Sequence, residues 1–209
     1  MSNDKKILIS LGRSFGSGGL DFAVKLHETL GIPVFDKGIL DKAAMDSNIR
    51  KELFEEADEN SKISIPYICG GSFPMTAPFF AYTDSYISTE TLFTKQSEAI
   101  KKIASESSAI FVGRCSDFVL RDDYPQMLSL FVTDDPSVRV KTIMERLGIA
   151  SEEEAKSVME KADQQRREYY NYYTSGHWGR ADNYDLCIKL SVLGMERAVQ
   201  MVCSIVNGQ

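Results

Sequence analysis

The sequence predicts a three-layer α/β/α sandwich, in which helices cover both faces of a mostly parallel central sheet. Short apolar segments rich in β-branched residues alternate with segments of helical periodicity along the 209 residues, an alternation typical of parallel sheets. The first apolar segment also runs directly into a glycine-rich turn and a helix. Hydrophobic residues make up 43% of the chain, enough for a large core.

The first 36 residues set out the repeating unit of this fold. Residues 6–11 (KILISL) predict a buried strand, and the glycine-rich turn follows them. Residues 20–30 repeat apolar side chains at helical spacing and end at a glycine, which favours a helix with a glycine stop. Residues 32–35 (IPVF) predict a second short strand that ends at Asp36. We therefore expect two parallel strands joined by a helix.

The next stretch is less regular. Residues 37–60 are strongly charged and predict a helical region, and residues 86–106 predict another helix. Between them, residues 61–83 contain three prolines, two adjacent glycines and several aromatic residues without a clear period. We expect an irregular insertion over about residues 61–85 that covers a substrate.

The C-terminal half returns to alternation. Apolar segments predict three further strands, at residues 109–112, 128–132 and 185–190, and periodic segments predict helices at residues 136–147, from residue 151 onward, and at residues 194–206. Ser151 with Glu154 three residues later is the capping-box pattern of a helix start. We expect residues 1–209 to form one domain.

The charge and cysteine content exclude several classes. A net charge of −6 argues against a broad grip on nucleic acid, which needs clustered Lys and Arg. The four cysteines are scattered without a C-x-x-C pair, so a zinc site or a disulfide framework is not expected. No apolar run is long enough for a signal peptide or a membrane span. We expect a cytoplasmic protein that binds neither membrane nor nucleic acid.

The glycine loop, GRSFGSGG at residues 12–19, is the first candidate site. A loop between a strand and a helix presents unpaired backbone N–H groups and the positive end of the helix dipole to an anion. Gly16, Ser17, Gly18, Gly19 and Leu20 are therefore the candidate phosphate-binding residues. A tight glycine turn without a ligand is the alternative, and the position of the loop favours phosphate.

This loop differs from the standard phosphate-binding motif, G-x-x-x-x-G-K-S/T. When the two are aligned on Gly18, Arg13 stands at the first glycine, Gly19 at the lysine and Leu20 at the hydroxyl residue. The lysine for the β- and γ-phosphates and the hydroxyl for magnesium are both missing. The order of the glycines does not fit a dinucleotide-binding fingerprint either.

Arginines at the ends of strands and helices form the second candidate site. Arg114 directly follows a buried strand, where open α/β sheets bind ligands. Arg139 lies early in the helix after the next strand, as either a phosphate ligand or a solvated helix charge. Asp163 and Arg166 share one helix face, so they form either a structural ion pair or part of a site, and both roles can hold together.

These segments resemble the cytidylate kinase-like family of P-loop nucleotide kinases over nearly the whole chain. The resemblance rests on ILISLGRSFGSGGLDFAVKLHETLGIPVFDK, IFVGRCSDFVLRD, the D-x-x-R of Asp163 and Arg166, and the block YYNYYT…W…NYDL. It implies a P-loop NTPase-like fold with a helical lid over about residues 155–180. It also implies that Asp36 lies near the acceptor nucleotide and that Arg114 binds the phosphate of the acceptor. Divergent members carry GSGG, as this chain does, and many follow it with arginine where this chain has Leu20.

The resemblance implies phosphoryl transfer from ATP to a nucleoside monophosphate, CMP above all. The glycine loop would hold the donor phosphates, and Arg13 is the candidate to replace the missing lysine. Asp163 and Arg166 would close over the site, and Arg139 would contribute to substrate binding. ATP implies Mg²⁺, for which no protein ligand can be named.

Two other functions stay open. One is a nucleotide sensor that binds ATP or a monophosphate without transferring a phosphoryl group, and the missing lysine and hydroxyl favour it. The other is a kinase for a different small acceptor. The partner expected in every case is a small-molecule nucleotide or acceptor, and a homo-oligomer is possible.

Overall fold

The computed structural model describes residues 6–45 and 89–208. The expected insertion at about 61–85 and most of the expected helical region at 37–60 lie outside the described residues. In the described part the strands are β1 (Leu8–Arg13), β2 (Val34–Phe35), β3 (Ala109–Val112), β4 (Leu128–Thr133) and β5 (Leu186–Lys189). They form one parallel sheet in the order β2-β3-β1-β4-β5.

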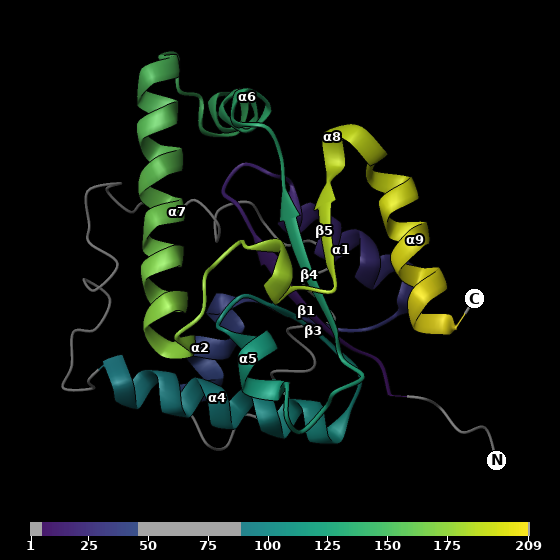
Figure 1. Cartoon of the computed structure of the whole chain (residues 1–209). Helices are drawn as coiled ribbons and strands as arrows, with labels where there is room; N and C mark the ends of the chain where they lie inside the picture. The colour runs from purple at the N-terminus through teal and green to yellow at the C-terminus, as the bar shows by residue number, and fades with distance from the viewer. Residues whose placement is uncertain (1–5, 46–88, 209) are drawn as a thin grey trace.

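Helices of the described residues surround this sheet (Figure 1). They are α1 (Gly19–Leu30), α2 (Lys37–Met45), α4 (Thr89–Glu106), α5 (Ser116–Leu120), α6 (Pro136–Leu147), α7 (Glu152–Thr174), α8 (Leu190–Leu193) and α9 (Met195–Asn207), with a 3₁₀ turn at Ala181–Asn183. No helix among them is both long and apolar enough to cross a lipid bilayer.

Two apolar cores give the three layers. One core joins the sheet to α1 and α9 and contains Phe22 and Val202. The other joins the opposite face of the sheet to α2, α4 and α5 and contains Leu40 and Ile100. All four side chains are buried completely, and their removal from water is the main force that holds the layers together. The three-layer α/β/α fold expected from the sequence is confirmed.

A smaller apolar cluster joins α6 to α7. Val140 and Ile143 of α6 pack against Ala155 and Met159 of α7, and Phe15 of the glycine loop packs against the same cluster. Ser151 caps α7, because its Oγ accepts a hydrogen bond from the Glu154 amide at 3.2 Å, as the sequence predicts. The two helices therefore form a unit beside the sheet that also contacts the glycine loop.

Several elements differ from the sequence expectations. Strand β1 continues through Gly12 to Arg13, because these residues pair with Phe131 and Val132 of β4. Helix α7 includes the aromatic YYNYYT segment and ends at Thr174, before the end of the helical lid expected at about residue 180. Helices α5 and α8 were not predicted, since segments of five and four residues are too short to show a period.

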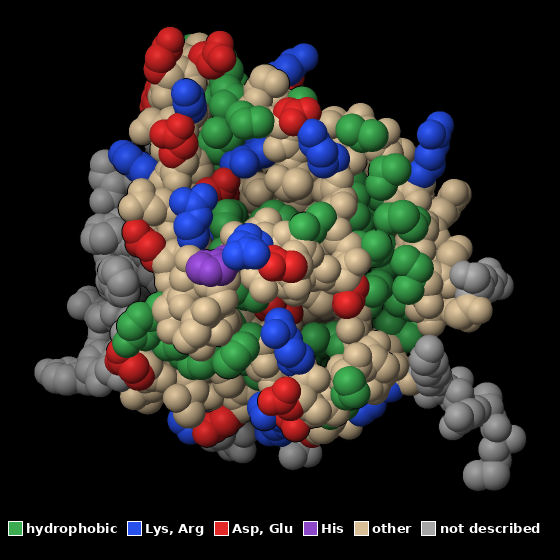
Figure 2. All heavy atoms as spheres, in the orientation of Figure 1, with side chains coloured by type: hydrophobic (Ala, Val, Ile, Leu, Met, Phe, Trp, Pro, Cys, Tyr) green, Lys and Arg blue, Asp and Glu red, His purple; other side chains and the backbone are tan. Residues whose placement is uncertain are grey.

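On the face of the molecule seen in Figure 2, Lys and Arg side chains are interspersed with Asp and Glu side chains. This face carries no extended basic surface, in keeping with the net charge of −6.

Candidate functional site

The glycine loop lies at the carboxyl end of β1 and leads into α1. Gly16 and Gly18 have φ values of +77° and +76°, a left-handed conformation that glycine adopts without strain. Gly18 precedes α1 without a side-chain cap. Among the described residues, no oxygen accepts a hydrogen bond from the amides of Gly16, Gly18 or Gly19. Amide groups arranged in this way at a helix start form a site for an anion.

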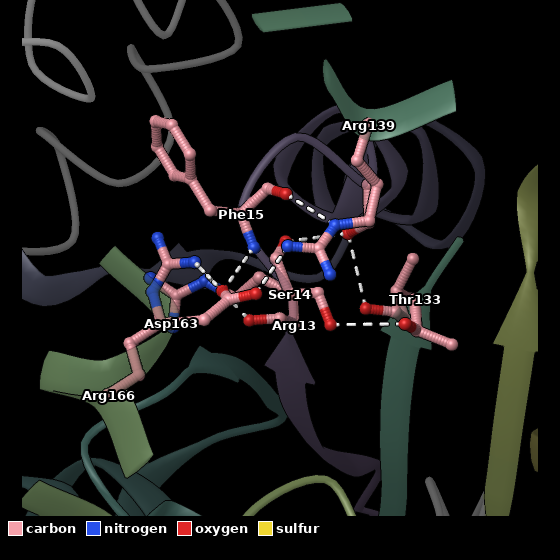
Figure 3. Close-up of polar contacts among 9 residues, drawn as sticks. Arg13, Ser14, Phe15, Thr133, Arg139, Asp163 and Arg166 are labelled. Carbon is pink, nitrogen blue, oxygen red and sulfur yellow. Dashed lines mark hydrogen bonds and ion pairs between the residues drawn. The ribbon is translucent and has the colours of Figure 1, made fainter. Parts of the chain in front are cut away.

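Neighbouring groups hold the loop in this shape. The Ser14 amide donates to the Val132 carbonyl at 2.9 Å. The Ser17 hydroxyl donates to the Ser14 carbonyl at 2.8 Å and lies 3.1 Å from the Val132 carbonyl. The Ser14 and Thr133 hydroxyls lie 3.1 Å apart (Figure 3). The loop is thus bound to the end of β4 and formed before a ligand arrives.

Asp163 links helix α7 to the glycine loop (Figure 3). One of its carboxylate oxygens accepts a hydrogen bond from the Phe15 amide at 2.7 Å, and the other forms an ion pair with Arg139 of α6. The Nε of Arg139 also donates to the Phe15 carbonyl at 2.8 Å. The peptide groups on both sides of Phe15 are therefore held by charged side chains from α6 and α7.

Burial shows which of the sequence alternatives apply to these residues. Arg139 and Asp163 are each only 8% exposed, so the alternative of a solvated charge at Arg139 is wrong. The Nη1 of Arg166 lies 3.4 Å from the Asp163 carboxylate, which confirms the ion pair within α7. A role of these residues in binding substrate stays a prediction.

Arg13 ends β1 and is half-buried at the centre of the site. Among the described residues, no oxygen accepts a hydrogen bond from its guanidinium group, although Arg166 reaches the Arg13 carbonyl at 3.5 Å. Burial first, and then the charges of Arg166 and Arg114, lower the pKa of Arg13 to about 9, while Asp36 and Asp163 act in the opposite direction. The group is still charged at pH 7, and a bound anion would stabilise it.

Arg114 lies in a strained turn after β3. Gly113, Arg114 and Cys115 follow one another with φ values of +80°, +57° and +55°, and the last two lie in a conformation that costs non-glycine residues energy. The Nη2 of Arg114 lies 3.0 Å and 3.1 Å from the two carboxylate oxygens of Asp41, and its guanidinium lies over the ring of Tyr169, 5.1 Å from the centroid. The turn thus directs Arg114 into a polar cluster between α2 and α7.

Asp36 lies at the end of β2 and caps α2. Its carboxylate accepts a hydrogen bond from the Ile39 amide at 3.1 Å, which satisfies one of the free amides at the start of a helix. Burial, followed by the charge of Arg114, lowers the pKa of the adjacent Lys37. The charge of Arg114 lowers the pKa of Arg13 and that of Asp36 raises it, so both side chains lie close enough to Arg13 to act on it.

Sequence reasoning missed four residues of this neighbourhood: Lys37, Asp41, Gln96 and Tyr169. Gln96 is 1% exposed; it donates to Asp41 at 2.5 Å and accepts from the Tyr169 hydroxyl at 2.9 Å. Asp41 lies one helical turn after Lys37 and Tyr169 lies three residues after Arg166, so helical spacing could have suggested both. For Gln96, the sequence indicates only that a polar residue lies on an otherwise apolar helix face.

The described residues do not supply a ready set of magnesium ligands. No group of three acidic, His or Cys side chains lies together among them. Leu20 packs against the apolar core instead of offering a hydroxyl, and Ser17 donates its hydroxyl to the backbone. Both carboxylate oxygens of Asp134 accept hydrogen bonds, from the Asp135 amide and from Ser191. Within this part of the chain, a magnesium ion would therefore depend on phosphate and water for most of its ligands.

A cavity of about 280 Å³ lies at the opposite end of the sheet. Its lining includes Asp117, Arg121, Ser129 and Tyr184, and none of the residues of the candidate site. Ser129 stands near the amino end of β4, whereas open parallel sheets bind ligands at the carboxyl ends of their strands. We therefore place the candidate site at the glycine loop.

The parallel sheet and the glycine loop at the carboxyl end of β1 define an α/β protein with the fold of P-loop kinases. The model of the cytidylate kinase-like family matches residues 8–192. The chain belongs to this family. No curated protein matches the sequence.

Solved structures show the same fold. A crystal structure of an uncharacterized protein from Eubacterium ventriosum has 29% identity and a TM-score of 0.72, and covers 98% of this chain and 100% of its own. Shikimate kinase from Bacteroides thetaiotaomicron has 12% identity and a TM-score of 0.51, with 96% and 98% covered. The YorR protein of Bacillus subtilis, in complex with phosphorylated GDP, has 13% identity and a TM-score of 0.51, with 96% and 95% covered.

Proposed function

We propose that this protein is a kinase that transfers the γ-phosphoryl group of ATP to a nucleoside monophosphate. The observation that carries the proposal is the position of Arg13. Its charged guanidinium lies near Arg114 and Arg166 where β1 runs into the glycine loop, and no described residue forms an ion pair with it. Three guanidinium groups in one place repel one another, and a polyphosphate is the kind of ligand that stabilises all of them.

In this proposal the donor and acceptor phosphates bind on two different sides of Arg13. The amides of Gly16, Gly18 and Gly19 suit the donor phosphates. Arg114, in its strained turn beside Asp41 of α2, suits the phosphate of the acceptor. Arg13 and Arg166 lie between the two sides, where negative charge must be stabilised during transfer.

The chemistry asks little covalent work of the protein. The bond between the γ-phosphorus and the β–γ bridging oxygen breaks and leaves ADP, and a bond forms between that phosphorus and a phosphate oxygen of the acceptor. This oxygen is already ionised at pH 7, so no general base is needed. Positioning and charge stabilisation remain, and Asp163 contributes to them by holding the loop and α7 together.

CMP is the acceptor that family membership favours. The complex of YorR with phosphorylated GDP supports a nucleotide ligand for this fold. Magnesium would enter with ATP, bound by phosphates and water, because the described residues lack a ligand set for it.

The experiment is an ADP-release assay with ATP and each nucleoside monophosphate, after a thermal-shift panel of the same nucleotides. We expect CMP to give the highest rate. Arg13→Ala should lower the rate by about 10²- to 10³-fold, the usual effect of removing one electrostatic contact to the transition state. Arg180→Ala is the control, because the side chain of Arg180 is 58% exposed and its ion-pair partner among the described residues is Asp182, two residues away. A rate that Arg13→Ala leaves unchanged would rule out this role of Arg13.

A nucleotide sensor without catalytic activity is the second candidate, and the side chain of Leu20 favours it. Leu20 stands at the metal-binding hydroxyl position and packs against the core, so the loop lacks one contact of an active kinase. Clear ATP binding in the thermal-shift panel, without ADP formation for any monophosphate or for other small hydroxyl acceptors, would establish the sensor and exclude the kinase.

A further inference from the structure

The side chain of Arg13 fills the space in front of two glycines. A Cβ atom added at Gly19 would lie 2.6 Å from the Cβ of Arg13 and 3.2 Å from its Cγ. A Cβ atom added at Gly113 would lie 2.3 Å from the Nη1 of Arg13. These distances are far below the roughly 3.5–4.0 Å at which carbon atoms pack. Arg13 therefore runs from the first residue of α1 to the turn after β3, and neither position can hold a side chain while Arg13 lies there.

Gly19 and Arg13 have exchanged the residue types that the phosphate-binding motif requires. In G-x-x-x-x-G-K-S/T the first position is glycine and the seventh is lysine, whereas this chain has Arg13 first and Gly19 seventh. The two positions are in contact in the structure, since the missing Cβ of Gly19 would fall on the stem of Arg13. The standard motif and this chain therefore each have one long cationic side chain and one glycine at these two positions, but in the opposite order.

We infer that Arg13 and Gly19 are a reciprocal exchange, in which Arg13 supplies from the end of β1 the phosphate-binding charge that a lysine would supply from the start of α1. Gly19 is a glycine because the stem of Arg13 occupies its space, whereas Gly113 also has a φ of +80°, which favours glycine by itself. The inference rests on the proposed function for its phosphate-binding part, and on packing alone for the role of the glycines. Because Nη1 of Arg13 lies at Gly113, directly before Arg114, the charge lies between the glycine loop and the expected acceptor side.

The packing part is tested by stability, without any nucleotide. Gly19 has no left-handed φ and stands in the first turn of α1, where alanine would by itself stabilise the helix. We expect Gly19→Ala to lower the thermal midpoint of the parent and to lower it much less in the Arg13→Gly background, where the added Cβ still meets the Cβ of Val132 at 3.3 Å. Arg180→Gly, the removal of an exposed loop arginine, is the control background and should keep the loss caused by Gly19→Ala.

The phosphate part is tested by calorimetric titration with ATP. We expect Arg13→Gly to bind ATP about 10- to 100-fold more weakly than the parent, the effect of losing a charged hydrogen bond. Gly19→Lys alone should also bind ATP more weakly than the parent, because the Cβ of the new side chain would collide with the stem of Arg13. The double variant Arg13→Gly/Gly19→Lys should regain most of that affinity, because the lysine then has both space and a vacant site for its charge. A double variant no tighter than Arg13→Gly would overturn the exchange.

The two measurements separate this inference from the proposed function. An equal effect of Gly19→Ala on the thermal midpoint in all three backgrounds overturns the packing part, whatever the protein binds. ATP binding by the parent that Arg13→Gly leaves unchanged overturns the charge role of Arg13 and leaves the kinase proposal in place. No ATP binding by the parent overturns the kinase proposal and the charge role together, and the thermal midpoints still decide whether Arg13 excludes a side chain at Gly19.

Discussion

At the scale of single residues, the conformation of Arg114 leads to a test of its proposed role in binding the acceptor. A φ of +57° is rare for arginine, and such strain persists where the surrounding structure holds it and a function uses it. We predict that Arg114→Ala weakens binding of the acceptor by about 2 kcal/mol, roughly 30-fold, because a charged hydrogen bond is lost. Titration with CMP and with ATP measures both affinities, and ATP should bind as before. An equal loss for both ligands would contradict the assignment of Arg114 to the acceptor.

Asp117 of α5 leads to a prediction for the pH dependence of stability. It is 6% exposed, its carboxylate accepts a hydrogen bond from the Tyr170 hydroxyl at 2.6 Å, and burial raises its pKa above the usual 3.8. The folded state therefore binds this proton more tightly than the unfolded state. As a result, the contribution of Asp117 to stability falls as pH rises from about the unfolded pKa through the raised folded pKa, and the cost is complete above it.

Asp117→Asn should therefore raise the free energy of unfolding at pH 7.5 relative to the parent, and raise it less at pH 4. Asparagine keeps an oxygen for the Tyr170 hydroxyl and removes the buried charge. Urea denaturation at both values measures this, with Asp122→Asn on the exposed turn after α5 as the control. A variant that loses more stability at pH 7.5 than at pH 4 would mean that the charged carboxylate stabilises the fold.

At the scale of elements, Asp163 couples α7 to the glycine loop. Removing one partner of a buried ion pair leaves the other charge unpaired, which typically costs about 3–5 kcal/mol. We predict that Asp163→Ala destabilises the protein by about 3 kcal/mol, because Arg139 would remain buried without its carboxylate. Urea denaturation measures the loss, and faster hydrogen exchange at the Phe15 amide locates it at the loop, since that amide donates to Asp163.

Ser151→Ala is the matched control on the same helix. It removes the cap of α7 far along the chain from Asp163 and should cost only about 1 kcal/mol, as helix caps do. It should also leave the exchange of the Phe15 amide unchanged. If both variants speed up that exchange equally, α7 acts on the loop as a whole and Asp163 has no special part in the coupling.

At the scale of the whole molecule, the sequence predicts the layers better than the site. Apolar segments locate the described strands to within two residues because a buried parallel strand is apolar throughout. Gly12 and Arg13 were assigned to the loop because glycine and charge interrupt the apolar segment, although both pair with β4. The YYNYYT segment has no apolar side chains at helical spacing other than its tyrosines. It continues α7, and tertiary contacts such as the hydrogen bond from Tyr170 to Asp117 help to keep it helical.

The parts of the site that depend on contacts between residues far apart in the chain could not be predicted from the sequence. The Phe15 amide meets Asp163 across 148 residues, and Arg139 reaches the Phe15 carbonyl across 124. Nothing in the local pattern around Phe15 shows that its peptide groups are held by two helices. Gly19 is the opposite case. The sequence shows that it departs from the motif, but only the structure shows that the stem of Arg13 occupies the space of its missing side chain.

A triple variant tests whether the molecule outside the glycine loop can support phosphoryl transfer. Arg13→Gly/Gly19→Lys/Leu20→Thr turns residues 13–20 into GSFGSGKT, the complete phosphate-binding motif. Leu20 is partly buried against the core, so the threonine should cost about 1 kcal/mol of stability through lost apolar burial. If the sheet, Arg114 and the helices α6 and α7 otherwise form a competent site, this variant should transfer phosphoryl groups from ATP in a magnesium-dependent way.

Its rate should exceed that of Arg13→Gly by about 10²-fold or more, since a charge and a metal ligand are both supplied. The ADP-release assay with CMP measures this rate, and Arg13→Gly/Gly19→Lys serves as the control that lacks only the hydroxyl. A folded triple variant that binds ATP with magnesium and transfers nothing would mean that the difference from a kinase is not confined to the glycine loop. The next place to search for that difference would be the proposed acceptor side, around Arg114 and Asp41, which would then bind a ligand other than a nucleoside monophosphate.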